Sequence, residues 1–178
     1  MDQLAAASGV SKAMISKVER GQSSPTAALL GRLSAALELS VSELLTGTRL
    51  GAAPAAVPGA AEPGGADRVR RVADVAQWRD PDTGYLRRQL SSPGFPAAVT
   101  EVTLPPGARV PYPAAAYAFI AQLVWVLSGQ LTLTDGPDRH LLTAGDTFEL
   151  GPPRAREFAN DTAHDCRYVV VVTRKSTA

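Results

Sequence analysis

The sequence predicts a multidomain α + β protein, with an all-α segment at the N-terminus and an all-β barrel at the C-terminus. Residues 1–46 contain no aromatic residue, and their apolar residues recur at the three- and four-residue spacing of helices. Glycine, alanine and proline dominate residues 47–66, which is typical of a linker. Over residues 67–178, short runs of Val, Leu, Tyr and Thr alternate with Gly or Pro, as expected for a sandwich or barrel.

Composition favours a cytoplasmic protein. Cys166 is the only cysteine, so no internal disulfide can form, which fits a reducing compartment. The N-terminus has no basic run followed by an apolar core, and no apolar run approaches the ~18 residues of a membrane span. We therefore expect neither a signal peptide nor a membrane partner. Because the net charge is only +1, a nucleic-acid-binding function would need positive charge concentrated locally.

Four helices are expected in the first segment. A short helix over Asp2–Ser8 should end at Gly9, because glycine accepts the left-handed cap conformation. Ser11 can cap a second helix, over Lys12–Arg20. Ser24 followed by Pro25 indicates the start of a third helix, whose interior contains an unexplained Gly31. Ser40 with Glu43 three residues later predicts a capping box for a short helix through Leu45.

The first two helices, joined by a short turn containing Gly9, predict a helix-turn-helix. Ile15 and Val18 lie on its inner face, whereas the outward face of the second helix carries Lys12, Ala13, Ser16 and Lys17. Such a face suits entry into the DNA major groove, where side chains of the first turn reach base edges and lysines reach guanine or phosphate. The alternative is an ordinary solvated face.

The sequence around these helices resembles the XRE group of lambda-repressor-like domains. The similarity is carried by Leu4–Ser11, Ile15-Ser16, Glu19-Arg20-Gly21 and Ser24-Pro25-Thr26, and it extends through Leu33 and Leu37 to Leu45. It implies a recognition helix that places Ser11, Lys12, Ala13, Ser16 and Lys17 against bases or phosphates. The group has five helices, of which the first would precede Asp2. We therefore expect residues 1–46 to be an N-terminally truncated domain whose first helix is missing.

Eight short strands are expected in the second segment, a number that fits a small barrel or jelly roll. They are predicted over residues 68–76, 85–90, 98–104, 119–127, 130–134, 140–142, 147–150 and 167–173. Pro105-Pro106-Gly107, Ser128-Gly129, Asp135-Gly136 and Ala144-Gly145-Asp146 mark turns between strands.

This segment resembles a cupin. The similarity rests on Leu104–Gly107, Val124–Leu131, Leu142–Thr147 and Asn160. It implies a jelly-roll barrel, and an XRE domain followed by a cupin is a known architecture of bacterial regulators. The C-terminal domain, residues 67–178, is therefore expected to be a cupin-like barrel.

The resemblance also locates the four places where cupins hold a metal. Counted from Gly107, Gly129 and Asn160, these places fall on Pro113, Ala115, Gln122 and Arg156. Proline and alanine cannot coordinate a metal, glutamine is a weak neutral donor, and arginine carries a fixed charge that repels cations. A one-residue slip over residues 114–116 brings in no His or Glu. We therefore expect neither a metal nor a cofactor.

A small-ligand pocket is one interpretation of the barrel interior. Its candidate residues are Tyr112, Gln122, Trp125, Arg156 and Phe158. The planar, five-donor guanidinium of Arg156 would suit a carboxylate or phosphate. The alternative is a barrel filled with side chains, in which Arg156 lies at the rim and pairs with Glu157 or Asp161.

Together these patterns predict a transcriptional regulator that binds a double-stranded DNA operator as a homodimer. Its barrel would sense a small, anionic effector, or dimerise, or do both. The chief alternative is a cupin metalloenzyme, a dioxygenase or isomerase with an appended helical domain, which the loss of metal ligands disfavours. A third reading is an interaction protein whose barrel only dimerises. No Ser-His-Asp set or paired carboxylates indicate catalysis, and a metal site from His140, His164, Asp165 and Cys166 is disfavoured.

Overall fold

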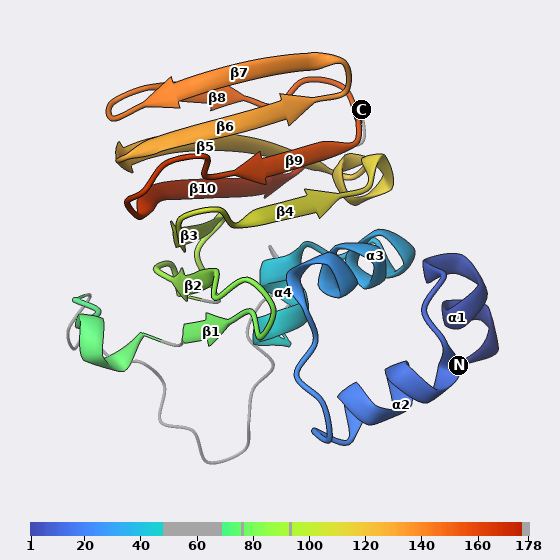
Figure 1. Cartoon of the computed structure of the whole chain (residues 1–178). Helices are drawn as coiled ribbons and strands as arrows, with labels where there is room; N and C mark the ends of the chain where they lie inside the picture. Colours follow the sequence, from blue (N-terminus) through green and yellow to red (C-terminus); the bar gives the residue numbers. More distant parts are fainter. Residues whose placement is uncertain (48–68, 76, 93, 176–178) are drawn as a thin grey trace.

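The computed structural model describes residues 1–47, 69–75, 77–92 and 94–175. Apart from Gly47, the predicted linker over residues 47–66 lies outside these residues. A group of short helices is followed by two β-sheets, with the helices packed at one end of the sheets (Figure 1). None of the helices in this part of the chain is long and apolar enough to cross a bilayer.

The four α-helices are those that the sequence predicts, with small shifts at their ends. They are α1 (Asp2–Ser8), α2 (Lys12–Glu19), α3 (Ala27–Leu37) and α4 (Val41–Thr46). The capping box of Ser40 and Glu43 is present. The predicted start of α3 at Ser24 and Pro25 was wrong, because the hydroxyl of Thr26 accepts from the backbone N–H of Leu29, 3.2 Å away, and caps the helix two residues later.

Two antiparallel sheets enclose the main core. The strands are β1 (Gln77–Arg79), β2 (Leu86–Gln89), β3 (Ala98–Leu104), β4 (Arg109–Tyr112), β5 (Ile120–Ser128), β6 (Gln130–Asp135), β7 (Asp138–Thr143), β8 (Thr147–Glu149), β9 (Arg156–Ala159) and β10 (Cys166–Arg174). One sheet has the order β1-β2-β3-β10-β5-β8 and the other β4-β9-β6-β7. Val102, Leu104, Val124 and Leu131 are completely buried in the core that the sheets share.

The β prediction differs from the structure at four places. The strand expected over residues 68–76 was wrong: its described part holds a short 3-10 helix, η1 (Val72–Asp74). Strands β1, β4 and β9 were missed. Strand β4 was not predicted because it contains Pro111. Proline is tolerated there because this strand is the edge of its sheet. Strand β9 was not predicted because it begins with two charged residues, Arg156 and Glu157.

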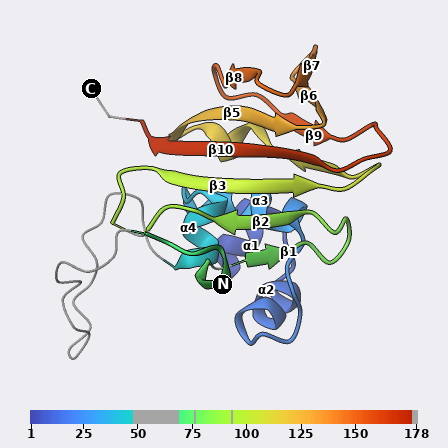
Figure 2. The ribbon, with the colours of Figure 1, turned by 90° about the vertical axis from the view of Figure 1, so that its left-hand side faces the viewer.

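Helices α3 and α4 close one end of the barrel. Helix α3 packs on β4 and on η2 (Ala114–Tyr117), a 3-10 helix after β4, while β1 and β2 flank the helices (Figures 1 and 2). This packing explains why α3 has a glycine at position 31, because a Cβ there would lie 2.6 Å from Cδ1 of Tyr112. On α4, Glu43 forms an ion pair of 2.9 Å with Arg174 of β10. The barrel and the helices therefore share one continuous interface.

The close approach at Gly31 reverses the usual effect of adding a methyl group to a helix. Alanine normally stabilises a helix interior by about 0.5–1 kcal/mol relative to glycine. We expect Gly31→Ala instead to lower the free energy of unfolding by about 1–3 kcal/mol, because the ring of Tyr112 must move. In a Tyr112→Ala background the same change should stabilise. Urea unfolding measures both, and stabilisation by Gly31→Ala in the otherwise unchanged protein would contradict the packing of α3 on β4.

Candidate functional site

Helix α2 presents an open face that fits a recognition helix. Ser11 caps it, its hydroxyl accepting from the N–H of Met14 at 3.3 Å. Lys12, Ala13 and Lys17 are exposed, Ser16 is half-buried, and Ile15 on the opposite face is buried. In both views α2 lies on the side of the molecule away from β5 to β8 (Figures 1 and 2). The predicted residues thus lie on one accessible surface.

The positive side chains on this surface are exposed, and the described ion pair among them is weak. Lys12 forms an ion pair with Asp2, but both side chains are largely exposed, so solvent screens the pair. Arg20, the residue that follows α2, is a further exposed cation that the sequence reading did not single out. The available signal was its position directly before Gly21, at the end of the predicted helix. A basic residue is electrostatically favoured at a helix C-terminus.

A small cavity of about 40 Å³ lies where the barrel meets α3 and α4. The predicted pocket residues Tyr112, Gln122 and Phe158 border it, together with Ser34, Ser40 and Ser42 of the helical segment. Helical residues were absent from the predicted pocket because nothing in the sequence places the helices at the end of the barrel. The cavity wall is largely apolar and aromatic, with a few polar groups.

Two predicted pocket residues lie elsewhere. Trp125 is 46% exposed, between the completely buried Val124 and Val126, and its side chain therefore points away from the core. Arg156 is buried, but its Nε lies 2.9 Å from Oδ1 of Asp135 and its Nη2 donates to the carbonyl of Pro152. The structure does not bring either side chain to the cavity.

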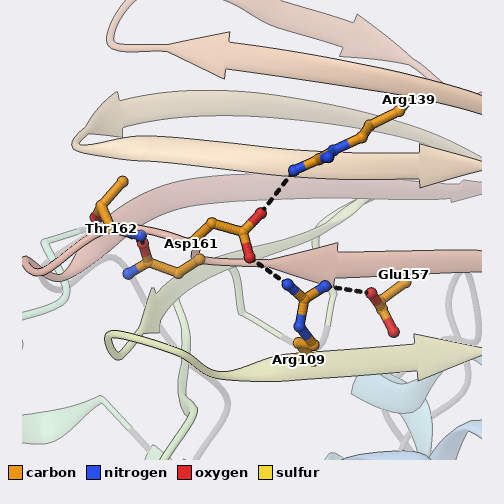
Figure 3. A network of polar contacts seen from close by, with 6 residues as sticks. Arg109, Arg139, Glu157, Asp161 and Thr162 are labelled. Atoms are coloured by element: carbon orange, nitrogen blue, oxygen red, sulfur yellow. Dashed lines mark hydrogen bonds and ion pairs between the residues drawn. The ribbon is translucent and has the colours of Figure 1, made fainter.

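Arg156 also does not occupy the rim. Its guanidinium carbon lies 4.4 Å from the ring centroid of Tyr117, a cation–π contact inside the barrel. The rim carboxylates that we considered as its partners are used by other residues. Arg109 pairs with both Glu157 and Asp161, and Arg139 pairs with Asp161 (Figure 3). The packed-barrel alternative was therefore wrong about its partner, which is Asp135.

The cation that borders the cavity is Arg87, which the sequence reading missed. Arg87 is 8% exposed, and it donates to the hydroxyls of Tyr85 at 2.8 Å and Ser42 at 3.0 Å. A third, longer contact of 3.5 Å reaches Thr100. The available signal was strand alternation, because Arg87 and Gln89 share one face of β2 whereas Arg88 points the opposite way.

The places corresponding to cupin metal ligands do not fit a metal. Ala115 is exposed on η2, Gln122 borders the cavity, and Arg156 is paired with Asp135. Across the described residues, no group of three or more His, Cys, Asp or Glu side chains could hold a metal ion. Cys166 is buried, and this burial raises the pKa of its thiol to about 11.

Asn160, which anchors the second cupin-like motif, has a structural role. Its side-chain amide donates to the carbonyls of Leu104 and His164, both at 2.8 Å, and its side-chain oxygen accepts from Thr162. Asn160 is completely buried. The residue therefore ties the end of β3 to the turn between β9 and β10.

The buried pair of Arg156 and Asp135 yields a stability test. Asp135→Asn should lower the free energy of unfolding by about 3–5 kcal/mol, because it leaves the Arg156 charge uncompensated in the core. The double variant Asp135→Asn/Arg156→Met should lose less. Asp138→Asn is the matched control, since its pair with Arg154 is largely exposed and is worth about 0–1 kcal/mol. Equal effects of the two single changes in chemical unfolding would refute this account.

Comparisons with known proteins agree with both halves of the fold. Residues 1–44 match the helix-turn-helix family HTH_3. No curated protein matches the chain in sequence. An HTH_3 family transcriptional regulator from Vibrio cholerae has a TM-score of 0.70 at 21% identity, over 98% of this chain and 86% of that one.

Two further structures match the β-domain. A predicted oxalate decarboxylase from Thermotoga maritima has a TM-score of 0.53 at 17% identity, over 60% of this chain and 99% of that one. The cupin domain of Cnp3 from Schizosaccharomyces pombe has a TM-score of 0.50 at 13% identity, over 61% and 74%. At these identities the structures share the fold alone. Residues 1–44 therefore match the helix-turn-helix family HTH_3, and the β-strands that follow share the fold of these cupin structures.

Proposed function

We propose that the protein is a sequence-specific DNA-binding transcriptional regulator. The observation that carries the proposal is α2: a capped helix in a helix-turn-helix domain, with Ser11, Lys12, Ala13 and Lys17 on an accessible face. Its N-terminal turn would reach base edges in the major groove, and Ser16 and Lys17 would contact bases or flanking phosphates. Lys12 can leave Asp2 for a phosphate at little cost, because the pair is exposed.

The protein would act as a homodimer on a near-palindromic operator. Helix-turn-helix dimers place two recognition helices about one DNA turn apart, so a two-fold protein matches a two-fold site. The barrel would supply dimerisation, effector sensing or both. Support for sensing comes from the cavity between the barrel and α3/α4, since a ligand there would contact the helical segment directly.

Binding should depend on Lys17. With an operator obtained by selection from random DNA, Lys17→Ala should weaken binding at every sequence alike and flatten the log–log salt slope by about 1, as expected for a phosphate contact. Arg139→Ala removes the same charge from an exposed position on the barrel and is the matched control. Fluorescence anisotropy at several salt concentrations distinguishes them. Identical affinities for the unchanged protein and for Lys12→Ala and Lys17→Ala would argue against α2 as the recognition helix.

A cupin metalloenzyme is the other functional class, and the side chains at the ligand places disfavour it. Iron, manganese, nickel or zinc should leave the melting temperature of the protein unchanged, because a ligand that binds only the folded state must raise it. Elemental analysis of the purified protein should give far less than one transition metal per chain. A stoichiometric metal, or a melting temperature raised by one of these ions, would favour the enzyme.

A further inference from the structure

We propose that the cavity between the barrel and α3/α4 binds a small carboxylate, of about the size of formate or acetate, at the guanidinium of Arg87. The proposal deepens the sensing role and rests on it for its biological purpose, although the site itself can be tested without DNA. It moves the anion site from Arg156, which the sequence favoured, to a residue of β2 beside α4.

The first argument is the charge of Arg87. The residue is 8% exposed, and within the described part of the chain the partners of its guanidinium are three neutral hydroxyls, those of Tyr85, Ser42 and Thr100. Burying a cation without a counter-charge is costly. An anion in the cavity would offset that cost and would accept charge-assisted hydrogen bonds.

The second argument is that two buried carboxylates of the barrel, those of Glu101 and Asp135, are already paired with other arginines. Glu101 holds Arg88 and Arg167, and Asp135 holds Arg156. The two buried arginines of the barrel therefore differ in kind. Arg156 is paired with the carboxylate of Asp135. Among the described residues, the five N–H donors of Arg87 meet hydroxyl acceptors alone, and the contact with Thr100 is at the 3.5 Å limit of a hydrogen bond.

The third argument is the wall around Arg87. The hydroxyl of Tyr112 is buried next to that of Tyr85, yet no hydrogen bond of good geometry ends on it. Burial raises the pKa of Tyr112, so this hydroxyl stays protonated and can donate to an anion. Tyr112 and Arg87 both border the cavity. The site therefore combines a cation, a neutral donor and apolar surroundings.

Size sets the ligand class. The cavity of about 40 Å³ holds about three or four water-sized positions, at roughly 10–15 Å³ each. Formate or acetate fits that space. A drug-sized ligand needs about 300 Å³ or more and would not fit this space.

The location links the anion to the helical segment. Arg87 belongs to β2 and its partner Ser42 to α4, and the Ser42 hydroxyl also lies 3.1 Å from that of Thr100 on β3. An anion held by Arg87 adds interactions at this contact between α4 and the barrel. Occupancy should therefore make α4 harder to separate from the sheets.

The experiment uses the full chain and compares sodium formate and sodium acetate with sodium chloride at equal ionic strength. At about ten times the dissociation constant, either carboxylate should raise the melting temperature by about 3–6 °C over chloride. Benzoate, which is too large for the cavity, should raise it less. Amide hydrogen exchange of α4 should slow in formate or acetate, with no comparable slowing in β7.

Two variants of adjacent residues test the assignment. Arg87→Met should abolish the carboxylate-dependent shift, whereas Arg88→Met, which faces the opposite side of the same strand, should retain it. If Arg87→Met does not fold, Tyr112→Phe provides the test, because it keeps the ring and should reduce the shift. No carboxylate-specific shift in the unchanged protein, or an undiminished shift in Arg87→Met or in Tyr112→Phe, would overturn the site. If the unchanged protein binds no DNA but shows the carboxylate-dependent shift, the proposed function is overturned and the anion site stands.

Discussion

The contact of α3 with β4 is the constraint on which the rest of the structure depends. Because position 31 has no side chain, the helix lies directly against Tyr112, and α4 follows onto β2 and β3. This packing forms a cavity at the end of the barrel, one wall of which belongs to the helix-turn-helix segment. Helix α2 lies on the far side of the helical group, where its outer face is accessible (Figure 1). The contact of α3 with β4 therefore belongs to the interface between helices and barrel that borders the cavity.

Two buried arginines divide the barrel into a structural part and a candidate binding part. Arg156 is held by Asp135, by the carbonyl of Pro152 and by the ring of Tyr117, and it behaves as a component of the core. Arg87 meets only hydroxyls at the contact with α4. Although both residues carry the same charge, within the described part of the chain only Arg156 is paired with a carboxylate. That difference separates a packing role from a binding role.

Local signals in the sequence predicted the four helices and most strands, whereas three strands and the long-range contacts were missed. The capping box of Ser40 and Glu43 and the turn at Gly9 located the helices, because caps depend on neighbouring residues alone. The cupin-like spacing located the barrel, but not the direction of Trp125 or the partner of Arg156, which depend on strand register. Arg87 was missed because its partner Ser42 is 45 residues away in the sequence.

The packing of α3 on β4 can be measured directly by NMR. The Gly31 Hα that occupies the place of a Cβ should show a strong nuclear Overhauser effect to the ring protons of Tyr112, and the ring current should shift its resonance. Both effects are expected in the free protein in solution. A Gly31 Hα with an unshifted resonance and no cross-peak to Tyr112, in a sample whose barrel is folded, would contradict the shared cavity and the coupling of the two domains that follows from it.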